Sequence, residues 1–195
     1  MDVQRGSISP TWSSPSTGNT GEMPMSTDNA AFFDAFYRQY HLRVLAYLRF
    51  RVRTDEAAEE LAAQVFERAL LHLADLREPE AAAAWLFRIA HNCVADYFRH
   101  TRREISLEWL IRREHPRTPS LEETVLANEE WRLLLAHVDQ LPEREREVIG
   151  LKFVGHLTNR EIARVLSLPE GTVGSLLYRT LVKLRNALRE EGGMP

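Results

Sequence analysis

The stretch from Leu141 to Arg189 constrains the fold of this chain more than any other part of the sequence. Its pattern predicts three successive helices. Thr158 is followed three residues later by Glu161, which is the spacing of a capping box at the start of a short helix. Pro169 is well placed at the first position of the next helix, which apolar spacing extends to the end of the stretch. A short helix, a tight turn and a longer helix are typical of a helix-turn-helix, whose second helix can enter the major groove of DNA.

The charge of this stretch agrees with a nucleic-acid partner. Between Thr158 and Arg189 there are six basic and two acidic residues, although the whole chain has a formal net charge of −3. A helical bundle whose arginines are only solvated could carry the same charge. The spacing of Glu161-Ile162-Ala163 and Gly171-Thr172-Val173 favours the DNA-binding interpretation.

Composition and periodicity divide the chain into four segments. Residues 1–26 are rich in Ser, Thr, Pro and Gly, and we expect a disordered tail there. Three helical patterns predict a first domain over residues 27–103. Residues 104–119 carry several Arg and Pro residues and predict a linker, and residues 120–191 predict a second domain that ends in the helix-turn-helix. The sequence therefore predicts an all-α protein with two small helical domains joined by a flexible linker.

Several classes of protein are excluded by composition. No run of 18 uncharged apolar residues exists, so we expect no membrane insertion. No secretory signal is visible, and Cys93 is the only cysteine, so we expect a cytoplasmic protein without disulfides or a cysteine-based zinc site. Cys93 is interpreted as a small core residue. The seven histidines form no ligand spacing, and no phosphate loop or nucleophile motif occurs. We therefore expect no enzyme activity, cofactor or metal.

Two helical segments of the first domain carry opposite charge. Between Asp55 and Glu80 there are eight acidic and two basic residues, and between Trp85 and Arg103 there are four arginines and one acid. Either face could simply be solvated. Arginines with aromatic neighbours also suit unpaired nucleic acid, because they follow phosphates while bases stack. Blocks of opposite charge indicate separate surfaces with separate partners.

In this order, the aromatic-rich helix, the acidic helix, the arginine-rich helix, the linker and the helix-turn-helix resemble a family of bacterial proteins. They are similar to the extracytoplasmic-function (ECF) sigma factors of RNA polymerase, the smallest members of the sigma-70 family. The resemblance covers about residues 30–190. Its most specific pieces are Trp85-Leu86-Phe87-Arg88-Ile89-Ala90-His91-Asn92 with Asp96 and Arg99, the motif from Leu141-Pro142 to Arg146, and the motif from Glu161-Ile162-Ala163 to Val173.

The resemblance implies a sigma factor that binds core polymerase and directs promoter recognition. The first domain, region 2 in that family, would melt the −10 element and hold its unpaired strand. The residues implied in this role are Arg88, Asn92, Asp96, Arg99, Arg102 and Arg103. The second domain, region 4, would bind the −35 element. The residues implied there are Arg160, Glu170, Gly171, Thr172, Ser175, Tyr178, Arg179 and Lys183.

The resemblance also implies protein partners. The acidic helix would dock on the clamp of the largest polymerase subunit, through Glu59, Glu60, Ala63, Gln64 and Glu67. The second domain would meet the flap of the β subunit, and an anti-sigma factor is expected as a regulator.

Two departures from the family pattern matter. Ala63 and Gln64 stand where Gln and Glu are usual, so clamp affinity is expected to be weaker or differently distributed. Gly174 and Leu176 stand where Lys and Arg are common in the recognition helix. This helix would therefore either read DNA with fewer contacts or offer an apolar face to a protein such as an anti-sigma factor.

Two other interpretations remain open at the level of sequence. A stand-alone helix-turn-helix regulator would leave the acidic helix and the Trp85–Arg103 helix unexplained. A sigma-like interaction module with weakened DNA binding would agree with Gly174 and Leu176.

Overall fold

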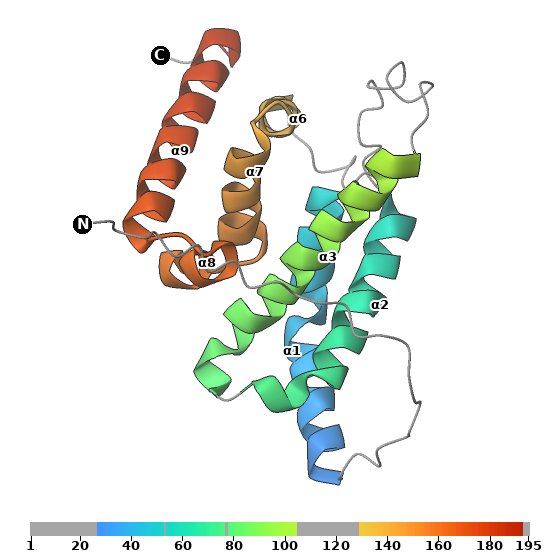
Figure 1. Cartoon of the computed structure of the whole chain (residues 1–195). Coiled ribbons are helices and arrows are strands. Elements are labelled where there is room, and N and C mark those ends of the chain that lie inside the picture. The colour runs from blue at the N-terminus through green and yellow to red at the C-terminus, as the bar shows by residue number, and fades with distance from the viewer. Residues whose placement is uncertain (1–26, 53, 77, 105–128, 193–195) are drawn as a thin grey trace, which may run out of the picture.

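The computed structural model of the chain describes residues 27–52, 54–76, 78–104 and 129–192, and within these ranges the chain is helical without a strand (Figure 1). The all-α expectation is therefore confirmed. The predicted tail, nearly all of the predicted linker and the helix start expected after the linker lie outside the described residues.

The first domain contains three long helices. They are α1 (Thr27–Arg51), α2 (Asp55–Leu71) and α3 (Ala82–Glu104), with two 3₁₀ turns, η1 (Leu73–Asp75) and η2 (Pro79–Ala81), between α2 and α3. These helices pack on one another.

Local sequence explains where α2 and α3 begin. The side chain of Thr54 accepts a hydrogen bond from the backbone N–H of Ala57 at 3.2 Å, which caps one of the free donors at the start of α2. Pro79 begins the 3₁₀ turn η2, and α3 follows directly. Cys93 lies on the buried side of α3 and is 1% exposed, so its prediction as a core residue is confirmed.

The second domain contains α6 (Glu129–Asp139), α7 (Glu143–Ile149), η3 (Gly150–Val154), α8 (Asn159–Leu166) and α9 (Glu170–Gly192). The segment η3 continues α7 as one π-helical turn, a wider turn that is rare and frequently occurs at functional sites. Helix α9 packs on α6, α7 and α8.

The predicted capping box of α8 is present in full. The Thr158 hydroxyl accepts from the N–H of Glu161 at 3.2 Å, and the Glu161 carboxylate accepts from the N–H of Thr158 at 2.7 Å. Ser167 then turns the chain with a left-handed φ of 53°. Helix α9 starts at Glu170, directly after Pro169, so the helix-turn-helix is confirmed in its predicted place.

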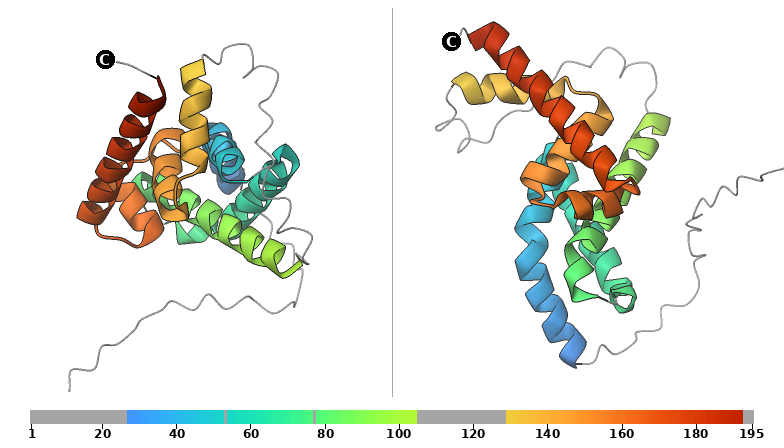
Figure 2. Two further views of the ribbon diagram at one scale, coloured as in Figure 1. Left: turned by 90° about the horizontal axis from the view of Figure 1, so that it is seen from above. Right: turned by 90° about the vertical axis from the view of Figure 1, so that its left-hand side faces the viewer.

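The two domains pack against each other and share one apolar core. Helix α3 packs on α8, and α1 packs on η3, as the views in Figures 1 and 2 show. Tyr47 and Phe87 of the first domain and Leu157 of the second are almost fully buried in this common core. The sequence predicted both domains but not this joint between them.

No helix in the described ranges is both long and apolar enough to cross a membrane.

Candidate nucleic-acid interface

Helix α3 presents an exposed polar face beside its buried side. Arg88, Asn92 and Arg99 are exposed and follow one another at helical intervals on this face. Asp96 is half-buried beside them. Arg102 and Arg103 lie in the last turn of α3, but their side chains are outside the part of the chain that the structure describes. The structure thus brings four of the six predicted −10 residues together.

Asp96 holds two arginines rather than standing free. One carboxylate oxygen is 3.4 Å from Nη1 of Arg68 on α2, and the other contacts Nη2 of Arg99. These pairs are partly exposed, so each contributes little to stability. Their effect is on position, because Asp96 orients the guanidinium of Arg99 along the exposed face.

The amino-terminal half of α9 presents a second polar face. Gly171, Ser175 and Arg179 are exposed at four-residue intervals, and Tyr178 beside them is 71% exposed. The remaining predicted −35 residues lie around this face: Arg160 and Glu170 are exposed, Thr172 is half-buried, and Lys183 is exposed farther along α9.

Two hydrogen bonds fix side chains on this face. The Ser175 hydroxyl donates to the carbonyl of Thr172 at 3.0 Å, and Nε of Arg179 donates to the carbonyl of Ser175 at 3.3 Å. Lys183 differs from the others because its Nζ pairs with Glu145 of α7 at 3.3 Å. The structure therefore does not group Lys183 with the amino-terminal face of α9.

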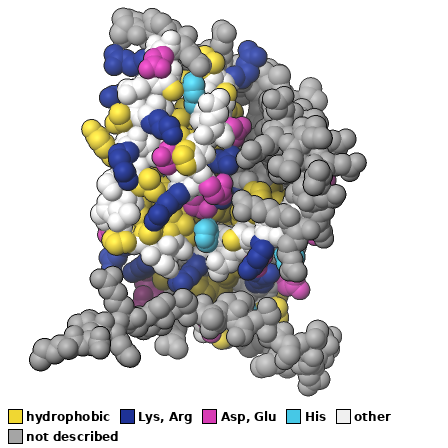
Figure 3. All heavy atoms as spheres, turned by 45° about the horizontal axis from the view of Figure 1, so that its top comes forward, with side chains coloured by type: hydrophobic (Ala, Val, Ile, Leu, Met, Phe, Trp, Pro, Cys, Tyr) yellow, Lys and Arg dark blue, Asp and Glu magenta, His cyan; other side chains and the backbone are white. Residues whose placement is uncertain are grey.

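Basic charge on the second domain is partly neutralised. In Figure 3 the Lys and Arg side chains are interspersed with Asp and Glu side chains and do not form an unbroken basic patch. Besides the Lys183 pair, Arg146 on α7 pairs with Glu143 at 3.2 Å. The net positive charge of the Thr158–Arg189 stretch is thus partly offset along the edge where α7 meets α9.

The two departures at Gly174 and Leu176 lie in different surroundings on α9. Leu176 is only 9% exposed and belongs to the core, so it adds nothing to an apolar outer face. The apolar side chains that α9 does expose are Tyr178 and Leu181. At Gly174, an added Cβ would have only the Asn159 amide within 4 Å, at 3.9 Å, so this position is open to a side chain.

Helix α2, which carries the acidic face, lies on the opposite side of the molecule from α9 (Figures 1 and 2). Its predicted partner-binding residues divide into two groups: Glu59, Glu60, Ala63 and Glu67 are exposed, and Gln64 is half-buried. Arg49 of α1 pairs with Asp55 at 3.1 Å and with Glu59 at 3.4 Å, which neutralises one end of the face. The rest of the acidic face is open.

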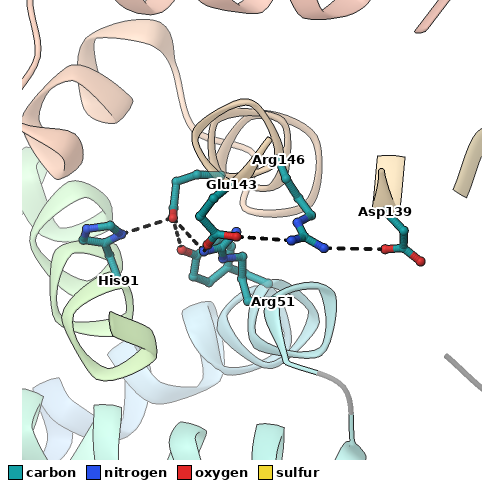
Figure 4. Close-up of polar contacts among 7 residues, drawn as sticks. Arg51, His91, Asp139, Glu143 and Arg146 are labelled. Carbon is teal, nitrogen blue, oxygen red and sulfur yellow. Dashed lines mark hydrogen bonds and ion pairs between the residues drawn. The ribbon is translucent and has the colours of Figure 1, made fainter. Parts of the chain in front are cut away.

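A buried polar cluster joins the two domains, and no pattern in the sequence predicted it directly. Its centre is Glu147 of α7, whose side chain is 8% exposed. The Tyr47 hydroxyl donates to Oε1 of Glu147 at 2.5 Å, Nη2 of Arg51 lies 2.8 Å from Oε2, and Nδ1 of His91 lies 3.1 Å from Oε1. Figure 4 shows Arg51 and His91 converging on this cluster, with Glu143, Arg146 and Asp139 extending it toward the surface. Three elements of the chain, α1, α3 and α7, therefore meet at one carboxylate.

The charges in this cluster stabilise one another. Burial raises the pKa of Glu147, but the hydrogen bond from His91 and the charge of Arg51 outweigh burial, so the pKa is lowered from its usual value. Burial and then the negative charge of Glu147 raise the pKa of Tyr47 well above its usual value. Burial lowers the pKa of Arg51, but the negative charge of Glu147 outweighs it and the pKa is raised. The buried carboxylate and the guanidinium are thus held in their charged forms.

A second contact between the domains lies at the end of η3. The guanidinium of Arg43 on α1 donates to the carbonyl of Gly155 from Nη2 at 2.6 Å and from Nε at 3.2 Å, and to the carbonyl of His156 at 3.4 Å. It also lies 5.4 Å from the ring centre of Tyr40 and 5.7 Å from that of Phe87. A cation at free carbonyls that end a helix is favourable.

A weak sequence signal for this joint exists. Arg43, Tyr47 and Arg51 follow at four-residue intervals on α1, and Glu143 and Glu147 do so on α7. Each set therefore shares one face of its helix. The spacing shows that the residues of each set lie on one side of their helix. It does not show that the two sets contact each other.

Two families match the chain in the order of the two domains. Sigma-70 region 2 matches residues 36–104, and Sigma-70 region 4 matches residues 131–184. The first match covers α1 to α3 and the second covers α6 to most of α9.

Relatives in curated collections are sigma factors. The chain is 32% identical over 163 residues to the ECF RNA polymerase sigma factor BldN of Streptomyces coelicolor, which covers 82% of this chain and 61% of the relative. It is 22% identical over 156 residues to the ECF RNA polymerase sigma factor SigM of Bacillus subtilis, covering 78% of this chain and 92% of the relative. The chain thus spans less than two thirds of the first relative and most of the second.

Two solved structures have a similar fold. One is the sigma factor RpoE in complex with the anti-sigma factor NepR from Bartonella quintana, with a TM-score of 0.65, 18% identity, and coverage of 82% of this chain and 95% of that chain. Another is CnrH in complex with the cytosolic domain of CnrY, with a TM-score of 0.58, 22% identity, and coverage of 83% and 90%. With both family matches in their expected order over the two helical domains, this chain belongs to the sigma-70 family of RNA polymerase sigma factors and is similar to its ECF members.

Proposed function

We propose that this protein binds core RNA polymerase and directs it to promoters, with the first domain at the −10 element and the second at the −35 element. The observation that carries the proposal is the presence of two polar helix faces, on α3 and α9, within the region 2 and region 4 matches. No catalytic group is assigned to the chain, because the polymerase performs the chemistry.

At the −10 element, α3 would hold unpaired DNA. Arg88 and Arg99 are exposed cations that can follow phosphates, and Asn92 between them can exchange hydrogen bonds with a base edge. Taking a base out of the stack costs a few kcal/mol, and contacts with the extruded base offset that cost. Asp96 supports this surface by holding Arg99 in place.

At the −35 element, the start of α9 would enter the major groove. An added Cβ at Gly171 would meet nothing within 4 Å, so the helix terminus is open to close approach by a DNA backbone. Its free N–H groups favour phosphate, and Arg179 can add a cationic contact. Tyr178 would supply an apolar contact to base edges.

The acidic face of α2 would bind the polymerase clamp, through Glu60, Ala63 and Glu67 among others. These side chains are exposed, and α2 lies on the opposite side of the molecule from α9 (Figure 1). Flap binding by the second domain and a cytoplasmic site of action follow from the same proposal. An anti-sigma factor is a further proposed partner, because the sigma factor RpoE in one similar solved structure is bound to the anti-sigma factor NepR.

Co-elution with purified core polymerase tests the proposal. The wild-type chain is expected to co-elute, and a Glu60→Lys/Glu67→Lys variant is expected to lose most of its affinity for core. The matched control is Glu78→Lys/Glu80→Lys, which reverses the same charge at exposed acids outside the α2 face. Failure of the wild-type chain to co-elute, together with binding to duplex DNA, would indicate a stand-alone regulator instead.

A further inference from the structure

We infer that Arg68, on α2, is a positioning residue for the −10 surface of α3. It shares the carboxylate of Asp96 with Arg99, and so leaves more of the positive charge of Arg99 available to unpaired DNA. In the sequence, Arg68 is only one of two cations in an otherwise acidic segment. This inference rests on the proposed function and adds a residue from a second helix to the same site.

Asp96 lies between two arginines from different helices. Helices α2 and α3 pack against each other (Figure 1). Nη1 of Arg68 on α2 donates to Oδ2 of Asp96 at 3.4 Å, and Nη2 of Arg99 on α3 contacts the other oxygen, Oδ1. Because each arginine uses its own oxygen, both pairs form at the same time. Two positive charges and one negative charge leave this Arg68–Asp96–Arg99 triad with a net positive charge.

The triad lies at the edge of the proposed DNA surface. Asp96 follows Asn92 by four residues on α3, so the two side chains share one face of the helix. Arg88, Asn92 and Arg99 are exposed on that face. The side chain of Arg68 is 42% exposed, so it reaches the edge of this face from the neighbouring helix.

Stability does not account for the triad. The side chains of Asp96 and Arg99 are 35% and 68% exposed, and charge pairs with this much exposure contribute little to folding. Buried apolar residues hold α2 and α3 in the fold instead, because Val65 and Ala69 of α2 and Val94 of α3 belong to the common core. The charges of the triad are therefore available for a role at the surface.

Arg68 changes the competition for Arg99. A phosphate must compete with Asp96 for the guanidinium of Arg99, because both anions bind it by charge-assisted hydrogen bonds. The positive charge of Arg68 beside the opposite oxygen weakens the attraction between Asp96 and Arg99, since charges a few ångströms apart still interact. Asp96 can therefore orient Arg99 without neutralising it. Without Arg68, the remaining pair has no net charge.

A direct contact between Arg68 and DNA is the alternative, because this side chain is partly exposed. The two roles differ in their dependence on Asp96. The positioning role requires the carboxylate, whereas a direct contact with a phosphate does not. The decisive experiment is therefore a double-mutant cycle, which measures the coupling between two side chains.

Binding is measured with the full chain assembled on core polymerase. The probe is a promoter fragment selected from a random-sequence library by the wild-type complex, with its −10 segment left unpaired. Arg68→Gln is expected to lower the affinity for this probe about two- to fivefold at low salt, the range of partly exposed charge pairs. The matched control, Arg38→Gln, removes the same charge from an exposed pair within α1 and is expected to leave the affinity unchanged. Arg68→Lys keeps the charge and is expected to bind like the wild type.

The cycle is completed in an Asp96→Asn background. There, Arg68→Gln is expected to have no further effect on affinity, because the carboxylate through which it acts is gone. An equal loss in both backgrounds would overturn the inference and assign Arg68 to direct DNA contact. Wild-type affinity in Arg68→Gln, or an equal loss in Arg38→Gln, would overturn it as well. So would binding of Arg68→Lys that is no tighter than that of Arg68→Gln, since the effect would then not follow charge.

Thermal unfolding and co-elution separate positioning from folding. Arg68→Gln is expected to unfold at the same temperature as Arg38→Gln and to co-elute with core polymerase like the wild type. A lower unfolding temperature than the control, or loss of co-elution, would make Arg68 a structural residue and overturn the inference. If the wild-type chain selects no shared promoter motif with core, the proposed function itself fails. If it selects one and the losses in the cycle are additive, only the role of Arg68 fails.

Discussion

Tyr47 and Glu147 lie a hundred residues apart in the chain, and the hydroxyl of one donates a 2.5 Å hydrogen bond to the carboxylate of the other in the buried joint between the two domains. Arg51 lies on the opposite oxygen of the same carboxylate, at 2.8 Å. A carboxylate buried in this way is stable only while its partners remain in place. Loss of the Glu147 carboxylate, or of one of its partners, is therefore expected to destabilise the joint between the domains.

Replacement of this carboxylate is expected to destabilise the protein. Glu147→Gln keeps the size of the side chain but removes the buried counter-charge of Arg51, which then pairs only with the more exposed carboxylate of Glu143. Removal of one partner of a buried pair costs at most about 3–5 kcal/mol. Urea denaturation would measure the lower free energy of unfolding. Asp34→Asn removes a charge from a pair exposed to solvent and is expected to change stability by less than about 1 kcal/mol. A similar loss in both variants would contradict the assigned role of Glu147.

The lowered pKa of this carboxylate predicts that the stability of the folded protein depends on pH. The pKa of Glu147 is lowered in the folded protein from a usual value of 4.5, so its ionised form contributes stability above about pH 4.5. That contribution is lost as the pH falls through the folded-state pKa, because the folded protein must then take up a proton that the unfolded chain has already bound. The stability difference between wild type and Glu147→Gln should therefore be constant near neutral pH and shrink in acid. A difference that grows as pH falls from 5 to 3 would contradict this sign.

The sequence predicted features formed by residues that are close together in the chain. It did not predict contacts between residues that are far apart in the chain. The Thr158–Glu161 capping box involves residues three apart, so spacing alone predicted it correctly. The Arg51–Glu147 pair joins helices that are distant in the chain, and many other charged residues could have formed the same pair. Nothing in the sequence indicated that η3 would be π-helical.

Part of the candidate site was predictable for the same reason. Arg88, Asn92 and Arg99 share one face because helical spacing requires it, and the structure leaves that face exposed. The burial of Leu176 could not be predicted from family pattern, because it depends on how α9 packs against its neighbours. The pairing of Lys183 with Glu145 depends on the same packing.

Basic substitutions at Gly174 and Leu176, two nearby positions on α9, are expected to have different effects. Gly174→Lys places a cation at an open position on α9 and is expected to strengthen −35 binding and make it more dependent on salt, by about one added phosphate contact. Leu176→Arg would instead place a charge in the core and is expected to destabilise the fold by several kcal/mol. Fluorescence anisotropy with promoter DNA over a salt series, together with thermal unfolding, measures both. Unchanged affinity in Gly174→Lys would contradict the interpretation that this helix reads DNA with fewer contacts.

If this chain gives core RNA polymerase its promoter specificity, run-off transcription from a random-sequence DNA library measures that specificity. Purified core polymerase with the wild-type chain should produce transcripts that start at a shared sequence motif, and core alone should not. An Arg88→Ala/Arg99→Ala variant should still co-elute with core but produce few such transcripts, because it retains the acidic face of α2 and lacks two cations of the −10 surface. If the transcripts are no more specific with the chain than without it, the chain does not confer promoter specificity.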